Sequence, residues 1–449
     1  SYGDSPYQSF STYAGNPYFI DLEQLIEEGV LTRKECNNVD FGTDETDIDY
    51  EKMYEGRYQL LRLAYERSNI SENPDYNQFV NENAWWLKDY ALFMALKERF
   101  NGVPWTEWPE DIRLRYGYSM EYYHRELYFD IEFQQYMQYQ YYRQWMNLKR
   151  YANENGVRII GDIPIYVAFD GSDSWSNPKL FQFNEEGLPV AVAGCPPDAF
   201  SETGQLWGNP LYDWEYHKKT GYKWWLQRVA YCFELYDVVR IDHFRGFDEY
   251  YSIPYGDETA VNGKWMPGPG YDLFKKLNTK LGDMDIIAED LGFLTDTVLE
   301  LLKQTGYPGM KILQFGFENP EENSFLPHNY VPNCVCYTGT HDNDTLMGWM
   351  KTAPKKSVKF AKEYLNLTEE EGYNWGMMKA IWSSNSDTAI VTMQDLIGLP
   401  NEARMNYPST TKGNWQWRAK PDYLSDELAE KVKYYTCLYQ RIPTKKRDN

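Results

Sequence analysis

Three carboxylates in this sequence follow short apolar runs, and they are the side chains best placed to do chemistry. Asp242 and Glu289 end two of these runs, and Asp342 comes shortly after a third. In a barrel of parallel strands the C-terminal strand ends form the active face, so such strands would bring the three acids to one pocket. One ionised carboxylate beside another that can give up a proton is what a retaining reaction at a glycosidic bond requires.

Arg240 strengthens this interpretation. It lies two residues before Asp242, so both side chains point to the same face of the predicted strand. A fixed cation beside a carboxylate favours the ionised form that a nucleophile needs. The alternative for any one of these acids is a structural role, as a helix N-cap or a salt-bridge partner. Three acids at successive strand ends favour the catalytic interpretation.

The composition argues against several classes of function. Lys and Arg number 45 against 67 Asp and Glu, a net charge of −22, which disfavours nucleic acid or an anionic membrane as partner. Six cysteines without a C-x-x-C pair and only five histidines predict neither a disulfide framework nor a metal site, and they favour a reducing, cytoplasmic location. The sequence has no P-loop, no G-x-G-x-x-G fingerprint, and no apolar run near the ~20 residues of a membrane helix.

Six short apolar runs alternate with amphipathic segments from residue 157 onward. Continuous apolar runs between helices predict a parallel sheet that is covered on both faces. In the absence of a dinucleotide fingerprint, they fit an α/β fold of the (β/α)8 TIM-barrel type better than a dinucleotide-binding fold. The predicted strands lie within residues 157–163, 237–242, 285–289, 310–315, 334–337 and 389–393.

Differences in composition and in the spacing of apolar residues divide the chain into parts. Residues 22–150 have apolar positions at helical spacing, and we expect an inserted, mainly helical subdomain there. Residues 1–21 and 151–449 would then form the catalytic barrel. Residues 171–221 are dense in Pro, Gly, Asn and Trp, which predicts a long loop insertion over the cleft.

Several short motifs along the chain form a recognisable set: SPYQS (5–9), GDIPIYV (161–167), PPD (196–198), ETGQLWGNP (202–210), VRIDHFRG (239–246), AEDLG (288–292), YTGTHDNDT (337–345) and GNW (413–415). The set resembles the amylomaltase family of 4-α-glucanotransferases, the disproportionating enzymes of the α-amylase clan, over essentially the whole chain. The family carries the first strands of its barrel before the SPYQS motif. Here the chain starts four residues before that motif, so we expect those strands to be absent.

The resemblance assigns roles to individual residues. It makes Asp242 the nucleophile that forms a β-glucosyl enzyme, Glu289 the general acid and base, and Asp342 a third acid that holds sugar hydroxyls. It makes Arg240 the residue that orients and ionises the nucleophile. The other substrate contacts that it implies are Tyr7 as a stacking platform, with Asp162, Gln205, Trp207, His341, Asn343 and Asn414. His243 is either a substrate ligand or a structural histidine.

The activity that the resemblance implies is transfer of α-1,4-glucan segments between maltooligosaccharides, by a retaining double displacement that uses no metal or other cofactor. The loop at 171–210, with Gln205 and Trp207, would exclude water and present an acceptor sugar. The partners would be neutral α-1,4-glucans, and the oligomeric state stays open. The alternatives are an α-amylase-like retaining hydrolase and a glucan-binding protein whose acids are structural.

Overall fold

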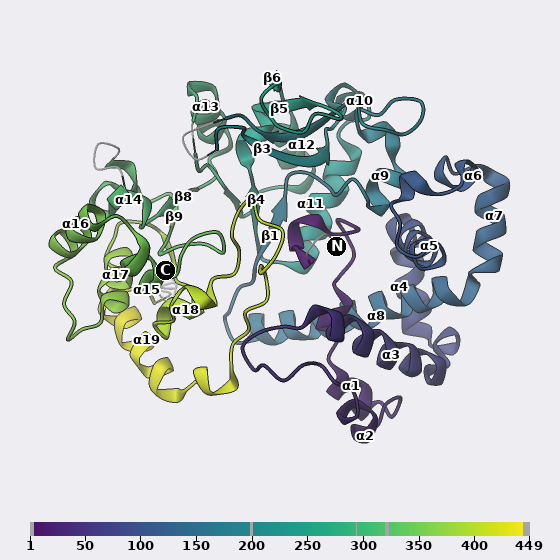
Figure 1. Ribbon diagram of the computed structural model, residues 1–449, viewed down its shortest axis with the longest axis horizontal. Coiled ribbons are helices and arrows are strands. Elements are labelled where there is room, and N and C mark those ends of the chain that lie inside the picture. The colour runs from purple at the N-terminus through teal and green to yellow at the C-terminus, as the bar shows by residue number, and fades with distance from the viewer. Residues whose placement is uncertain (1–3, 198–200, 293, 319–322, 443–449) are drawn as a thin grey trace, which may run out of the picture. The chain divides into compact units, whose positions relative to one another are not determined.

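The computed structural model describes residues 4–197, 201–292, 294–318 and 323–442 (Figure 1). The chain divides into two compact units. The first unit comprises Ser1–Gly42, Asp49–Ile286 and Leu294–Thr305. The second comprises Thr43–Ile48, Ile287–Phe293 and Gly306–Asn449. Each unit packs its own buried aliphatic and aromatic side chains into hydrophobic clusters.

Helices make up most of residues 22–150, drawn in purple and blue in Figure 1. The sequence starts several of them with a capping side chain: Asp21, Thr32, Asp49 and Asn73 each accept a backbone N–H of the helix that follows. The bounds are α1 Leu22–Glu27, α2 Arg33–Asn37, α3 Tyr50–Ser68, α4 Pro74–Glu82, α5 Ala84–Arg99, α6 Glu110–Arg113, α7 Gly117–Glu126 and α8 Tyr128–Glu154.

Two buried glutamines of α8 hold the N-terminal segment in place. Gln138 accepts the N–H of Gly15 at 2.8 Å and donates to the carbonyl of Gly15 at 2.9 Å. Gln144 makes the same pair of bonds with Asp21, at 2.7 and 3.3 Å. Position 15 requires glycine, because a Cβ there would lie 2.0 Å from the ring of Tyr141. The segment before α1 is therefore tied to the helical part of the first unit.

The first parallel sheet has the order β1-β4-β7. Its strands are β1 (Ile160–Pro164), β4 (Val238–Asp242) and β7 (Ile286–Ala288). The register of β1 and β4 places Asp162 opposite Arg240 and Pro164 opposite Asp242. The helix α11 (Lys223–Leu235) leads into β4, and α12 (Tyr271–Leu281) leads into β7, as expected for parallel strands joined by helical crossovers.

The second unit contains a parallel sheet with the order β10-β9-β8. Its strands are β8 (Gly309–Ile312), β9 (Cys334–Tyr337) and β10 (Thr388–Ile390), and α13 (Asp296–Thr305) precedes β8 in the chain. Each of the six predicted apolar runs thus overlaps a strand. The helices of this unit are α14 Phe315–Glu318, α15 Leu346–Thr352, α16 Lys355–Leu365, α17 Tyr373–Trp382, α18 Met393–Leu396 and α19 Asp426–Leu438.

The stretch 171–221, predicted as a loop insertion, contains regular elements. They include α9 (Ser172–Ser176), β2 (Ala191–Cys195), β3 (Gln205–Pro210) and α10 (Trp214–Lys219). The strands β2 and β3 join β5 (Glu249–Pro254) and β6 (Lys264–Pro267) in a sheet of order β3-β2-β5-β6, paired antiparallel. The close pairing of β2 and β3 requires glycine at position 194, because a Cβ there would lie 2.1 Å from the carbonyl oxygen of Gln205. Glycine ordinarily indicates a loop, so the composition of this stretch did not predict the strands. Asp198 of the PPD motif lies outside the described residues.

Arg228 of α11 fixes the chain where it leaves β1. Its side chain is buried and donates to the carbonyls of Pro164 and Ile165, the latter at 3.0 Å. The guanidinium carbon also lies 4.8 Å from the ring centroid of Trp225. A planar guanidinium suits this place because it can serve two carbonyls at once and still pack against an aromatic ring.

We expect Arg228→Met to lower the free energy of unfolding by about 1–3 kcal/mol, because the Pro164 carbonyl loses the guanidinium donor and the Ile165 carbonyl keeps only the Tyr212 hydroxyl. Denaturant unfolding followed by circular dichroism measures the change. Arg158→Met is the control: the side chain of Arg158 is 58% exposed in its ion pair with Asp285, so its loss should cost less than about 1 kcal/mol. Equal losses in the two variants would show that Arg228 does not hold this end of β1.

Candidate active site

A buried guanidinium joins two carboxylates on neighbouring strands of the first unit. Arg240 on β4 donates to both oxygens of Asp162 on β1, at 2.7 and 2.8 Å, and its other terminal nitrogen lies 3.1 Å from Asp242. The Arg240 side chain is 9% exposed, whereas each carboxylate is 33% exposed. The parallel register creates this arrangement, because Asp162 and Arg240 are direct partners across the two strands. The buried Arg240 side chain thus holds both carboxylates, and each carboxylate stays partly exposed to solvent.

Tyr7 completes this cluster from the N-terminal segment. It lies in the short helix η2 (Pro6–Gln8), where Ser5 caps the backbone N–H of Tyr7 and Pro6 occupies the first position. The Tyr7 hydroxyl donates to Asp162. Burial raises the pKa of Tyr7 well above its usual range, and the charges of Asp162 and Asp242 raise it further. Tyr7 therefore stays a neutral phenol that donates a hydrogen bond to an acid.

Trp207 of β3 lies beside the residue that follows Asp242. Its ring is edge-on to His243, with the ring centroids 4.9 Å apart and the planes at 88°. The Trp207 indole N–H donates to the side-chain oxygen of Gln205 at 3.0 Å. The structure thus brings both β3 residues predicted as substrate contacts together and places Trp207 next to the β4 strand end.

His243 has an unusual backbone and a shifted pKa. Its φ is +54°, a left-handed conformation that is uncommon outside glycine. Burial lowers the pKa of His243 to about 4, and the charge of Arg245 contributes to the shift. A neutral imidazole at physiological pH agrees with either role left open by the sequence and disfavours a role as a cation.

In the second unit, the loop after β9 holds Asp342. One oxygen of Asp342 accepts the amide N–H of Asn406 at 2.6 Å, and the other lies 3.4 Å from the ring nitrogen of His341. Arg404 donates to the backbone carbonyl of Asp342 and pairs with Asp344. The carboxylate is therefore fixed both through its own oxygen and through its main chain.

Asn343 and Asn414 of this unit make hydrogen bonds within their own loops. The Asn343 side-chain oxygen accepts the Thr340 N–H at 2.8 Å. The Asn414 oxygen accepts the Tyr407 N–H at 2.8 Å, and its amide donates to the Thr410 hydroxyl at 2.9 Å. Both asparagines, predicted as substrate contacts, thus already have hydrogen-bond partners within their own loops.

Glu289 follows β7 in the second unit, and one of its carboxylate oxygens accepts the N–H of Leu291 at 2.7 Å. The next residue, Asp290, is half-buried and accepts the N–H of Met310 in β8 at 2.7 Å. Burial raises the pKa of Asp290. Position 309 must be small, since a Cβ on Gly309 would lie 2.3 Å from a carboxylate oxygen of Asp290. The turn that presents Glu289 is therefore anchored by its neighbour.

The predicted residues divide between the units. The first unit contains Tyr7, Asp162, Gln205, Trp207, Arg240, Asp242 and His243, and the second contains Glu289, His341, Asp342, Asn343 and Asn414.

Sequence reasoning did not single out Arg404, Asn406 or Trp415. Asn406 and Arg404 hold Asp342, and the Trp415 ring lies 5.2 Å from that of His341. Trp415 belongs to the GNW motif (413–415), but the resemblance assigned it no role. Arg404 and Asn406 lie 62 and 64 residues from Asp342 in the sequence, so no local spacing pattern could have linked them to it.

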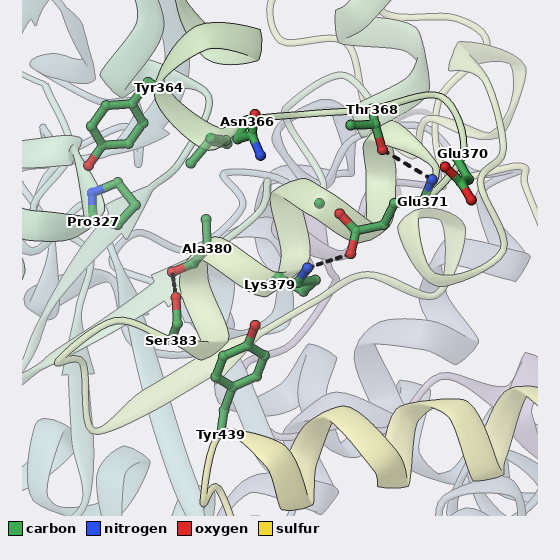
Figure 2. Close-up of a pocket in the computed structure, with 12 residues that line it drawn as sticks. Pro327, Tyr364, Asn366, Thr368, Glu370, Glu371, Lys379, Ala380, Ser383 and Tyr439 are labelled. Atoms are coloured by element: carbon green, nitrogen blue, oxygen red, sulfur yellow. Dashed lines mark hydrogen bonds and ion pairs between the residues drawn. The ribbon is translucent and has the colours of Figure 1, made fainter.

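A separate hollow of about 690 Å³ opens in the second unit (Figure 2). Tyr364 and Tyr439 line it, and Glu371 pairs with Lys379 inside it. None of the residues predicted for the site lines this hollow. Across the described ranges, no group of three or more His, Cys, Asp or Glu side chains is placed to hold a metal ion, and no helix has the length and apolarity to cross a membrane.

Comparison with known proteins gives a consistent assignment. A family model described as 4-alpha-glucanotransferase matches residues 1–424. The chain is 52% identical over 443 residues to the 4-alpha-glucanotransferase of Clostridium butyricum, covering 98% of this chain and 91% of that protein. It is 44% identical over 452 residues to the 4-alpha-glucanotransferase of Thermus thermophilus, covering 98% and 89%.

A solved structure extends the similarity to the fold. The amylomaltase of Streptococcus agalactiae, in complex with acarbose, matches with a TM-score of 0.95 at 39% identity over 98% of this chain and 90% of that one. This match confirms the α/β barrel class that the strand pattern predicts. With strand ends, motifs and relatives in agreement, the chain belongs to the 4-alpha-glucanotransferase family of enzymes.

Proposed function

We propose that the chain transfers α-1,4-glucan segments between maltooligosaccharides by a retaining double displacement, with Asp242 as nucleophile and Glu289 as general acid and base. The observation that carries the proposal is the buried Arg240 fork, which holds Asp242 and Asp162 by their carboxylates. A guanidinium so close to Asp242 stabilises its charge and fixes its direction. Family membership supports the same reaction class.

The two steps balance in bonds and protons. In the first, an oxygen of Asp242 bonds to the anomeric carbon while the glycosidic C–O bond breaks, and Glu289 gives its proton to the departing oxygen. In the second, the 4-hydroxyl of an acceptor sugar attacks that carbon, the ester bond to Asp242 breaks, and Glu289 takes the hydroxyl proton. The two inversions together retain the α-configuration, and the products are again α-1,4-glucans.

Asp342 would hold hydroxyls of the sugar at the reacting carbon. The Asn406 amide bond and the Arg404 contact to its main chain keep its carboxylate in one orientation. His341 lies next to it, packed against Trp415. An acid fixed in this way can favour a distorted ring in the transition state over the relaxed ring of the bound substrate.

Transfer requires that an acceptor sugar reaches the intermediate before water does. A bound, oriented acceptor can act at an effective concentration of about 10⁵ M or more. Trp207 lies against His243, the residue next to the nucleophile, and offers an aromatic face of the kind that binds sugars. We assign to Trp207 and Gln205 part of this orientation.

We also propose that the protein acts in the cytoplasm. The six cysteines all lie within the described residues and form no disulfide there, as suits a reducing compartment.

Replacing the nucleophile should abolish transfer. We expect Asp242→Ala to lower kcat for maltotriose disproportionation by about 10⁴-fold or more, because no other group forms the glycosyl ester. Thin-layer chromatography of maltotriose products measures it, and thermal unfolding checks that the variant folds. Asp285→Ala removes an exposed acid just before β7 and should leave the rate unchanged. An Asp242→Ala enzyme that kept a tenth of the wild-type rate would disprove the assignment.

Replacing the general acid should be rescued by a good leaving group. We expect Glu289→Gln to slow maltotriose turnover by about 10²–10⁴-fold, because the departing oxygen no longer receives a proton. An α-maltosyl fluoride donor needs no proton, so its fluoride release in the first turnover should fall far less, and mass spectrometry of the denatured enzyme should show a glycosyl adduct. Equal losses with both donors would contradict the role of Glu289.

Removing the Trp207 ring should shift the balance from transfer to hydrolysis. We expect Trp207→Ala to raise the ratio of hydrolysis to transfer several-fold, because the acceptor loses orientation while water does not. Reducing-end release, compared with the yield of maltopentaose from maltotriose, gives the ratio. Trp207→Phe keeps an aromatic face and should stay near wild type. If the rates of transfer and hydrolysis fall by the same factor in Trp207→Ala, Trp207 has only a structural role.

A further inference from the structure

One buried carboxylate holds both ends of the loop that carries Asp342. Asp395 accepts the Thr338 hydroxyl at 2.7 Å through one oxygen and the Leu346 N–H at 2.7 Å through the other. Thr338 directly follows β9, and Leu346 is the first residue of α15. The residues between these two anchors include His341 and Asp342. The N–H of Leu346 is one that a helix start leaves without an internal partner, so Asp395 satisfies it.

Asp395 is itself rigidly placed. It is 1% exposed, in α18, where the Thr392 hydroxyl caps its backbone N–H. Asn374 of α17 donates to the Asp395 backbone carbonyl at 2.7 Å. Among the residues that the structure describes, Asp395 is in no ion pair, and burial raises its pKa. The buried carboxylate is thus held by two hydrogen bonds from the loop.

We propose that Asp395 is a positioning residue for the reaction and acts through Asp342, by fixing the two ends of the loop from Thr338 to Leu346. The proposal rests on the role given to Asp342 under the proposed function. Thr338, Leu346 and Asp395 are all almost fully buried, so the anchors share one packed site behind the loop. A displacement of about 1 Å in a group that orients substrate can cost about 10²-fold in rate.

The alternative is that Asp395 only stabilises the fold. A structural role would lower stability and change activity only through loss of folded enzyme. A positioning role predicts instead a lower kcat of the folded enzyme with little change in KM, together with rescue by a side chain that keeps both hydrogen bonds. Asparagine can do so, because its oxygen accepts the Leu346 N–H and its amide donates to the Thr338 hydroxyl.

The experiment measures kcat and KM for maltotriose below the melting temperature of every variant. We expect Asp395→Ala to lose about 10²-fold in kcat with KM within threefold of wild type, and Asp395→Asn to recover most of that loss. Thr338→Val, which removes one anchor without changing the shape of the side chain, should lose roughly tenfold if half of the restraint is gone. Ala361→Gly in α16 of the same unit is a control that lowers stability away from the loop and should keep kcat.

A double-mutant cycle with Asp342→Ala decides between the two roles. If Asp395 acts through Asp342, adding Asp395→Ala to Asp342→Ala should change kcat by less than threefold, because the interaction is already lost. The inference would be overturned if the double variant lost kcat by the product of the two single losses. A wild-type kcat in Thr338→Val would also overturn it, and this variant provides the test if Asp395→Ala fails to fold. A wild-type kcat in Asp342→Ala alone would instead refute the proposed role of Asp342.

Discussion

One buried cation, Arg240, holds the two carboxylates predicted for the site in the first unit. A guanidinium that is 9% exposed is stable only with partners that satisfy its charge and its N–H groups, and Asp162 and Asp242 supply them. The arrangement depends on register, since a shift of one residue between β1 and β4 would turn these side chains to the opposite face. Two carboxylates around one cation leave a net negative charge, which suits a transition state in which positive charge develops on the sugar.

Asp342 is held in a different way. The Asn406 amide donates to its carboxylate, and Arg404 donates to its backbone carbonyl and pairs with Asp344. A hydrogen bond from a neutral amide orients a carboxylate without placing a further charge beside it. The Arg240 pair therefore suits an acid that must stay ionised, and the Asn406 contact suits an acid that must hold sugar hydroxyls.

The predictable and unpredictable parts of the site differ in how locally they are encoded. The six parallel strands could be predicted because each is a short apolar run, and Asp242 and Glu289 could be singled out because each ends such a run. The antiparallel strands β2 and β3 could not, since close pairing at Gly194 requires a residue type that ordinarily signals a loop. Asn406 and Asp395 could not be predicted from the sequence, because Asn406 contacts Asp342 and Asp395 contacts Thr338 across 64 and 57 residues of chain. Contacts at such separations arise only from the packing of the folded chain.

Both units use a buried acid to hold a segment that carries a proposed substrate contact. Asp173 accepts the N–H and hydroxyl of Thr12 at 2.8 and 3.0 Å, and so anchors the segment that bears Tyr7. Asp395 does the same for the loop of Asp342. Burial raises the pKa of both acids, so each carries a desolvation cost. An apolar side chain would avoid that cost but would leave buried N–H groups unpaired and the loop free to adopt other conformations. In both places, therefore, a single loop conformation is gained at some expense of stability.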